Sequence, residues 1–242
     1  SSAFTIKGSI AVTAPTAGEI LSVNGAKTIT WTKTGTITTV NLYYSIDNFT
    51  TSTLITTAGA VTGVSYAWTV ADAISSNAKI KVVDADAGHP ATDGISPAFT
   101  IKGVLGITAP TAGEILNVNN AKTITWTKTG TITTVNLYYS TNDFTTQTTI
   151  ALAATGTTLV WTVPDAISAN VKIKVADADA GHPASDMTSA AFTIKGGLAI
   201  TAPTVGEVLN VNGVKTITWT KTGTIATVNL LFSTNDFTTQ TT

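Results

Sequence analysis

The stretch KTITWTKTGTI spans Lys27–Ile37, and identical copies of it begin at Lys122 and Lys215. Within it threonine alternates with larger side chains, so Ile29 and Trp31 fall on one face of an extended chain and the threonines on the other. A period of two is typical of a β-strand that has one face in a core. The Thr-Gly pair near its end marks a turn. The stretch therefore predicts a half-buried strand that occurs three times.

The three copies define a long internal repeat. The tryptophan of the stretch recurs at intervals of 95 and 93 positions. A second motif, FTIKG, closes each unit and begins at Phe4, Phe99 and Phe192. Solenoid repeats have periods of roughly 20 to 50 residues, so a period near 94 matches a whole small domain instead.

The two motifs divide the chain into four segments. Residues 1–8 are expected to be the last strand of a preceding repeat, because they carry the closing motif alone. Residues 9–103 and 104–196 form two complete repeats, and residues 197–242 form the first half of a third. We therefore expect the natural polypeptide to continue in both directions with the same period.

The remainder of each copy shows the same alternation. In the first copy the sets that share an inward face are Val40, Leu42 and Tyr44; Tyr66, Trp68 and Val70; Ala78, Ile80 and Val82; and Phe99 and Ile101. Turn signals such as Asn-Gly separate these runs. Seven or so short strands in about 94 residues predict an all-β fold of tandem Ig-like (Greek-key) β-sandwich domains. Because only a few residues join one unit to the next, the domains are expected to lie end to end.

Composition narrows the function. The chain is 43% hydrophobic and 11% charged, with a net charge of −1, and 52 of its 242 residues are threonine, which suits exposed strand faces. All 13 basic residues are lysine, so neither a basic field nor arginine forks are present to bind nucleic acid. Cysteine is absent, which excludes disulfide and thiol chemistry. No apolar run is long enough for a membrane span in this segment.

The second copy is similar to a known family. It contains, in order, ITAPTAGEILNVNNAKTITWT, VNLYYSTNDF, WTVPDAISANVKIKVADA and FTIKG. That order resembles the Ig-like domain of fungal Ser/Thr-rich GPI-anchored cell-wall proteins and the "PNGGE-W" repeats of large secreted bacterial and archaeal proteins. The resemblance implies an extracellular, non-catalytic module of walls, adhesins and stalks, with no active-site residues to carry over. The family's aromatic residue after Gly-Glu is replaced here by Leu21, Leu116 and Leu209.

An acidic segment recurs near the end of each repeat. DADAGHPATD spans Asp84–Asp93 and DADAGHPASD spans Asp177–Asp186, and we call these segments the aspartate loops. Each lies between the last two long strands, at the end of the sandwich where the chain enters. Asp and Gly favour a solvated turn whether or not a metal is present. Alternatively, calcium takes roughly six to eight oxygen ligands. The candidate calcium ligands are Asp84, Asp86, Asp93, Asp177, Asp179 and Asp186.

Other recurring polar residues favour structural interpretations. His89 and His182 lie in the aspartate loops, but a zinc site needs about three or four ligands, and the chain has no further His and no Cys. No nucleophile motif accompanies them, so we expect no enzymatic activity. A Gly-Glu pair opens each copy, and its carboxylate is expected to accept a hydrogen bond from a backbone turn; these residues are Glu19, Glu114 and Glu207.

Two classes of function remain. The near-identity of the copies favours a non-catalytic extracellular structural protein, a fragment of a long tandem-repeat stalk, fibre or adhesin at the cell surface. Its partners would be neighbouring repeats and copies of itself. The alternative is a carbohydrate-binding or cell-wall-binding module, with exposed Tyr43 and Tyr138 in contact with surface glycans, or an accessory spacer of a secreted enzyme. The only cofactor that either alternative leaves open is calcium at the aspartate loops.

Overall fold

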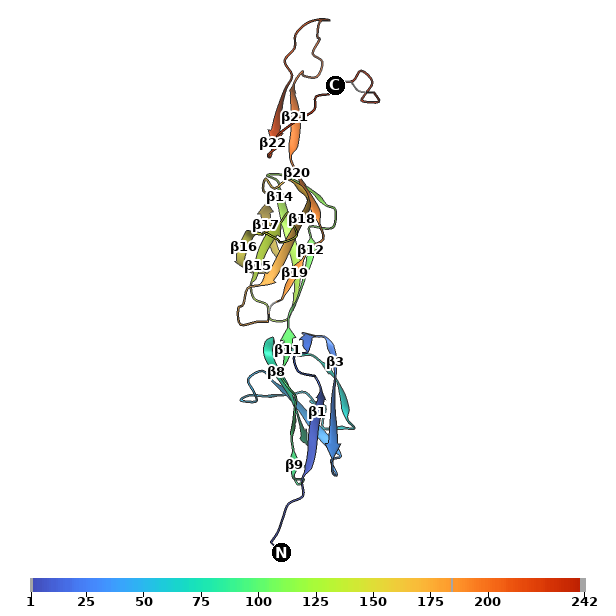
Figure 1. Ribbon diagram of the computed structural model, residues 1–242, viewed down its shortest axis with the longest axis vertical. Coiled ribbons are helices and arrows are strands. Elements are labelled where there is room, and N and C mark those ends of the chain that lie inside the picture. Colours follow the sequence, from blue (N-terminus) through green and yellow to red (C-terminus); the bar gives the residue numbers. More distant parts are fainter. Residues whose placement is uncertain (1, 184, 240–242) are drawn as a thin grey trace.

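The computed structural model describes residues 2–183 and 185–239 and shows two β-sandwiches stacked end to end, followed by a β-hairpin (Figure 1). Every regular element in the described residues is a strand. None of them belongs to a helix long and apolar enough to cross a membrane. The predicted fold class, all-β with tandem Ig-like β-sandwiches, is confirmed.

The first sandwich consists of two sheets. One has the strand order β7-β3-β1-β9, and the other the order β2-β11-β8-β4-β5, with β10 paired to β8 and β6 to β4. The strands are β1 (Gly8–Ala14), β2 (Ile20–Ser22), β3 (Ala26–Thr34), β4 (Thr39–Ser45), β5 (Thr53–Leu54), β6 (Val61–Thr62), β7 (Ser65–Thr69), β8 (Ser75–Asp84), β9 (Ala91–Thr92), β10 (Gly94–Ile95) and β11 (Phe99–Lys102).

The second sandwich repeats this topology. Its sheets have the orders β12-β14-β17 and β13-β20-β18-β15-β16, with β19 paired to β18. The strands are β12 (Val104–Ala109), β13 (Ile115–Asn117), β14 (Ala121–Thr129), β15 (Val135–Ser140), β16 (Thr148–Ala154), β17 (Thr158–Thr162), β18 (Ser168–Asp177), β19 (Asp186–Thr188) and β20 (Phe192–Lys195). In both sandwiches the short second strand runs parallel to the closing FTIK strand, which locks the start of the unit to its end.

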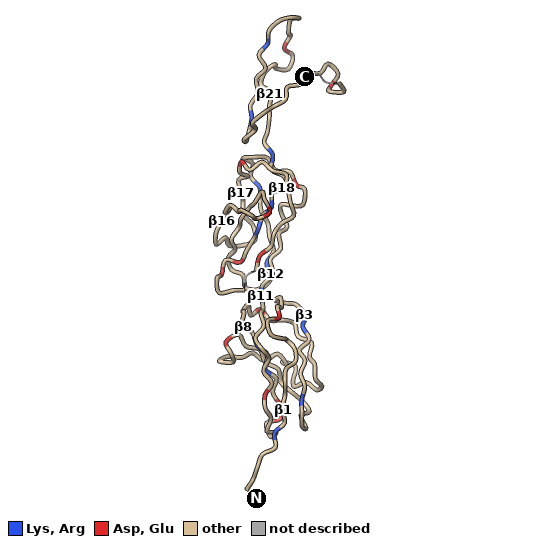
Figure 2. The backbone as a smooth tube through the Cα atoms, in the orientation of Figure 1, with Lys and Arg blue, Asp and Glu red and all other residues tan. Residues whose placement is uncertain are grey.

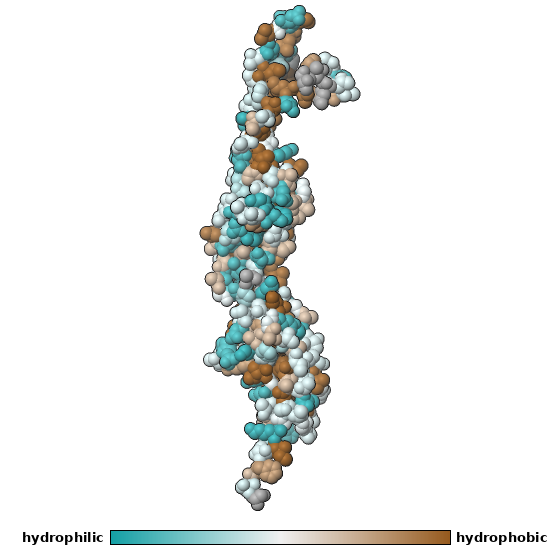
Figure 3. Space-filling view, viewed as in Figure 1, coloured by the Kyte–Doolittle hydropathy of each residue, from teal (hydrophilic) through white to brown (hydrophobic). Residues whose placement is uncertain are grey.

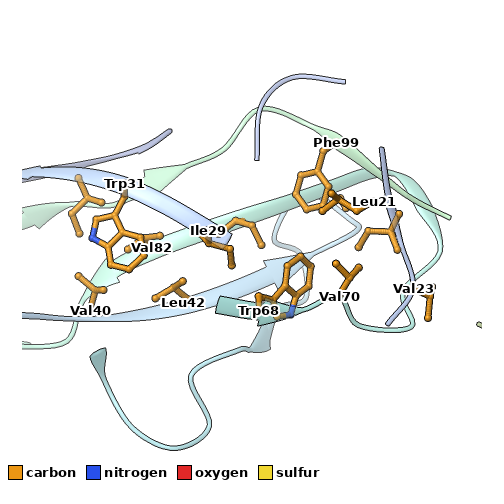
Figure 4. Close-up of a cluster of buried hydrophobic side chains, with 14 of the residues drawn as sticks. Leu21, Val23, Ile29, Trp31, Val40, Leu42, Trp68, Val70, Val82 and Phe99 are labelled. Atoms are coloured by element: carbon orange, nitrogen blue, oxygen red, sulfur yellow. The ribbon is translucent and has the colours of Figure 1, made fainter. Parts of the chain in front are cut away.

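The alternating residues form the two cores. Ile29 and Trp31 of the quoted stretch are 0% and 2% exposed, and Phe99 and Ile101 of the closing motif are fully buried. Figure 4 shows Ile29, Trp31 and Phe99 between the sheets, with Trp68 at the end of the core that lies beside Phe99. Because each sandwich buries its own separate cluster, each has what an independent domain needs to fold.

The repeats differ where their lengths differ. In the second sandwich β16 is one continuous edge strand of seven residues along β15. In the first sandwich the matching segment is two residues longer and forms two short strands, β5 and β6. Gly59 lies between these two strands with a φ of +114°, a value that glycine adopts without steric cost. The insertion therefore divides an edge strand that is continuous in the second sandwich.

The third unit is a hairpin of β21 (Gly197–Ala202) and β22 (Thr218–Thr222) with extended segments beyond it. Its Ile217, Trp219, Leu230 and Phe232 are 38–63% exposed, although the counterparts of the first three are buried in the complete sandwiches and those of Phe232 are half-buried. Ile217, Leu230 and Phe232, together with Ile200, line a cavity of about 490 Å³. In Figure 3 this end of the molecule shows strongly hydrophobic side chains on its surface.

Candidate functional site

The two aspartate loops fold into the same turn. Asp84 is the last residue of β8, and its Oδ1 accepts a hydrogen bond of 3.0 Å from the Asp86 amide. Asp86 Oδ1 in turn accepts one of 2.9 Å from the Gly88 amide, and its backbone carbonyl accepts one of 3.1 Å from the His89 amide. The second loop repeats all three bonds, at 3.0, 2.8 and 3.2 Å. Aspartate side chains that accept bonds from the backbone two residues on are typical of Asx turns.

A histidine lies over each buried aspartate. In the second loop, His182 Nδ1 lies 2.8 Å from Asp177 Oδ2, and its Nε2 lies 3.5 Å from Asp179 Oδ2. In the first loop, the matching distances from His89 are 3.5 and 3.3 Å. The side chains of Asp84 and Asp177 are only 4% and 3% exposed. A buried carboxylate needs hydrogen-bond partners, and the imidazole is placed to be one.

The remaining predicted ligands lie apart from this turn. Asp93 is exposed between β9 and β10, and Asp186 is exposed at the start of β19. In residues 2–183 and 185–239, no group of three or more His, Asp or Glu side chains is arranged to hold a metal ion. The turn uses one oxygen of Asp84, Asp86, Asp177 and Asp179 for a backbone amide and directs the other toward the loop histidine. Calcium binding by Asp84, Asp86, Asp93, Asp177, Asp179 and Asp186 stays a prediction.

Each aspartate loop borders the segment through which the chain enters its sandwich. The Gly8 amide donates a hydrogen bond of 3.1 Å to the Pro90 carbonyl, and Gly8 pairs with Ala91 in a short parallel bridge. In the second sandwich the Ser185 hydroxyl donates a bond of 3.0 Å to the Gly103 carbonyl. The loops thus lie at the entry end, as the strand order predicts.

The same end of the second sandwich contacts the first sandwich directly. The Thr131 amide donates a hydrogen bond of 3.0 Å to Asp72 Oδ1, and the Thr131 hydroxyl donates one of 2.6 Å to Asp72 Oδ2. Between the second sandwich and the third unit, the Thr224 amide donates a bond of 3.0 Å to Asp165 Oδ1, and its hydroxyl donates to Asp165 Oδ2. These bonds, led by the one from the hydroxyl, lower the pKa of Asp165.

An apolar contact accompanies each pair of hydrogen bonds. A Cβ added to Gly130 would lie 3.1 to 3.3 Å from Val23, Asp72 and Ile74 of the first sandwich. Gly223 is surrounded in the same way by Val118, Asp165 and Ile167. Ile74 is half-buried and packs against both hydrophobic cores. We call Val23, Asp72 and Ile74, or Val118, Asp165 and Ile167, the tip of a sandwich. We call the Gly-Thr-Ile turns at 35–37, 130–132 and 223–225 the sockets; the sockets at 130–132 and 223–225 each contact the tip of the preceding sandwich.

Sequence reasoning did not find the joint between sandwiches. A signal for it does exist, because the segments VADAIS and VPDAIS place Asp72 and Asp165 at matching positions of the repeat. The socket is the Thr-Gly turn at the end of the quoted stretch. That turn recurs without change as TGTI in all three copies.

The Gly-Glu carboxylates have the predicted structural role. The Thr16 amide donates a hydrogen bond of 3.0 Å to Glu19 Oε2, and the Thr111 amide does the same to Glu114. Lys27 also forms an ion pair with Glu19, a contact that the sequence pattern does not predict. The pKa of Glu19 is lowered, first by the hydrogen bond from Lys27 and then, against the opposing effect of burial, by the Thr16 amide.

Tyr43 and Tyr138 lie on the outer sheet face, each beside a lysine. Lys81 Nζ is 5.8 Å from the centre of the Tyr43 ring and 5.0 Å from that of Phe49. The second sandwich repeats the cluster, with Lys174 at 5.4 Å from Tyr138 and 5.0 Å from Phe144. Contacts of this kind are cation–π interactions. Figure 2 shows the charged residues distributed along both sandwiches rather than gathered in one patch.

No protein-family profile and no curated protein sequence matches the chain. It is similar to the fibronectin(III)-like modules of CbhA from Clostridium thermocellum, at 18% identity and a TM-score of 0.28, over 77% of this chain and 94% of that one. It is also similar to the N-terminal four Ig domains of Dscam1 isoform 6.9, at 12% identity and a TM-score of 0.36, over 80% of this chain and 47% of that one. It is similar as well to the FN1-FN3 domains of chicken CNTN1, at 11% identity and a TM-score of 0.32, over 77% of this chain and 68% of that one. The chain spans about half the length of the Dscam1 structure.

Proposed function

We propose that the chain is a non-catalytic structural segment of an extracellular stalk, fibre or adhesin, in which each sandwich is a spacer held at a fixed angle to the next. One observation carries this proposal: the two joints of the chain are built from the same contacts. Asp72 accepts hydrogen bonds from Thr131 as Asp165 does from Thr224. Gly130 and Gly223 contact corresponding tip residues of the preceding sandwich. A joint that recurs in detail is a property of the repeat.

The joint resists bending and twisting for identifiable reasons. Only Gly103 separates β11 from β12, so the connection has almost no slack. A carboxylate that accepts two hydrogen bonds from one residue restricts rotation about the long axis, because both oxygens must stay aligned with the amide and the hydroxyl. Ile74 packs against both cores and restricts tilting. These contacts act together on a connection one residue long, so the two sandwiches are expected to move as a single rod.

The extracellular assignment rests on sequence. Threonine-rich strand faces and a cysteine-free array of near-identical domains are in keeping with a cell-surface spacer, and the resemblance to cell-wall and secreted repeat families suggests the same location. Limited proteolysis of intact cells of the source organism tests this assignment. Release of peptides that contain FTIKG before the cells lyse supports a surface location, and their release only after lysis would refute it.

A glycan-binding role is the second candidate, because both complete sandwiches present the same aromatic and lysine cluster on the outer sheet face. The cluster of Tyr43, Phe49 and Lys81 recurs as Tyr138, Phe144 and Lys174. A glycan array probed with the whole chain distinguishes the candidates. Binding that is lost in a double variant, Tyr43→Ala with Tyr138→Ala, would favour recognition. Absence of binding leaves the spacer, whether of a stalk or of a secreted enzyme.

A further inference from the structure

The chain has three sockets, and they differ in what surrounds them. The socket glycines of the second and third units, Gly130 and Gly223, are half-buried against the tip of the preceding sandwich. The glycine of the first socket, Gly35, is exposed, and a Cβ added to it would approach only Gly8, at 3.2 Å. All three glycines have positive φ, at +83°, +92° and +84°, so the first socket has the same backbone shape as the other two.

The first socket opens into a cavity of about 340 Å³. Its lining includes Lys7, Gly8, Thr36, Ile37 and His89. Among the described residues no hydrogen bond engages the amide or the hydroxyl of Thr36, whereas the same two groups of Thr131 both bond to Asp72. The cavity therefore presents an amide, a hydroxyl and a lysine next to the apolar side chain of Ile37. Paired donors beside an apolar side chain match a carboxylate that is followed closely by an aliphatic residue.

The aspartate-loop histidine is also more exposed beside the open first socket than beside the covered second socket. Beside the second socket, which the first sandwich covers, His182 is 19% exposed and lies within hydrogen-bonding distance of Asp177. Beside the first socket, His89 is 42% exposed and Asp84 Oδ2 is buried without a hydrogen-bond partner. From the first aspartate to the histidine the two turns have the same sequence and the same hydrogen bonds, and the loops differ at Thr92 and Ser185 and in the sockets beside them.

We propose that the first socket, Gly35–Ile37 with its cavity, is a docking surface for the tip of a further copy of this repeat, and that docking draws the aspartate-loop histidine onto its buried aspartate. The inference rests on the proposed spacer function and specifies what the spacer binds at its entry end. The occupant is an Asp-Ala-Ile segment like the one that begins at Asp72, with its carboxylate bound to Thr36 and its isoleucine packed against Ile37. The same surface holds this occupant at both other joints.

The test adds one repeat to the chain. Residues 104–191 are inserted before Phe4, so that the FTIKG motif at 4–8 closes the added sandwich and its copy of Asp165 faces Thr36. Hydrogen exchange is followed by mass spectrometry in peptide 33–49, which Ile46 distinguishes from its counterparts, and in peptide 84–99. A matched control carries Asp165→Ala in the inserted copy alone, an exposed position whose change leaves the sandwich folded.

If the tip docks, hydrogen exchange should slow about tenfold or more in peptide 33–49 and should also slow in peptide 84–99. Both effects should be lost in the control. Unchanged exchange in both peptides would overturn the proposal, as would equal protection in the control. The peptide over residues 128–144 reports on the existing joint at Thr131 and is followed in the chain without the insert, where it occurs once. If that peptide is protected while peptide 33–49 is not, the docking inference alone fails. If neither is protected, the spacer function fails with it.

Discussion

Replacing Ile74 by alanine should weaken the coupling between the first two sandwiches without emptying either core. The substitution removes three carbon atoms, and each fully buried methylene contributes about 0.8 kcal/mol, which sets an upper limit of about 2.4 kcal/mol. Because Ile74 is only half-buried, between two clusters, we expect a loss of about 1.2 kcal/mol. That loss falls on the interface, so the two sandwiches should unfold more independently.

Urea unfolding followed by tryptophan fluorescence measures this effect, because the complete sandwiches bury four tryptophans in their two cores. The matched control is Ile20→Ala, a residue that is 62% exposed in the same sandwich and should change stability by less than about 0.5 kcal/mol. In the Ile74 variant the transition should shift to lower urea and become broader or split in two. If the two variants unfold with the same midpoint and the same steepness, Ile74 does not couple the sandwiches and the reasoning is wrong.

Three further predictions concern the interior, the ion pairs and the aspartate loops. Ser96→Ala should lower the free energy of unfolding by about 1–3 kcal/mol in urea titrations. The buried hydroxyl of Ser96 accepts a hydrogen bond of 2.9 Å from the Ile80 amide, and its loss leaves that amide unpaired. A decrease below about 0.5 kcal/mol would contradict this. The pKa of Glu114 is lowered from 4.5, first by the hydrogen bond from Lys122, so its contribution to stability is present above pH 4.5 and lost as the pH falls through the lowered value. The melting temperature should therefore fall in acid, and fall less in Lys122→Met; an equal fall in both would refute the assignment. Because the aspartate-loop carboxylates already bond to amides and face histidine, EDTA should leave the melting temperature unchanged, whereas a calcium-dependent rise would establish the alternative.

Much of the fold could be predicted because its signals are local and repeated. The alternation around Ile29 and Trp31 has a period of two, and hydrophobic burial acts on it directly, so the strand and its inward face follow from eleven residues. The FTIKG motif marks the closing strand for the same reason. The break between β5 and β6 could not be predicted in this way, because it lies at Gly59 and arises from backbone conformation rather than from polarity.

The joint could not be predicted from periodicity. Asp72 and Thr131 lie 59 positions apart in exposed turns, and a hydrogen bond between two polar turns leaves no alternating pattern along the chain. The position of the aspartate loops followed from strand order. The contact of His182 with Asp177 could not be predicted from strand order, because it depends on the side-chain conformations within the turn. What the sequence does retain is the strict recurrence of the segments that form tip and socket.

Small-angle X-ray scattering of the whole chain, compared with a double variant that carries Asp72→Ala and Asp165→Ala, tests most directly whether the joints are rigid. Loss of both carboxylates removes the hydrogen bonds at each joint while leaving both cores untouched. The native chain should scatter as a single extended rod whose distance distribution matches the end-to-end arrangement in Figure 1. The double variant should show a shorter mean extension and a broader distribution. A native chain that already scatters as a flexible ensemble, or a variant that is indistinguishable from it, would contradict the clamped joint.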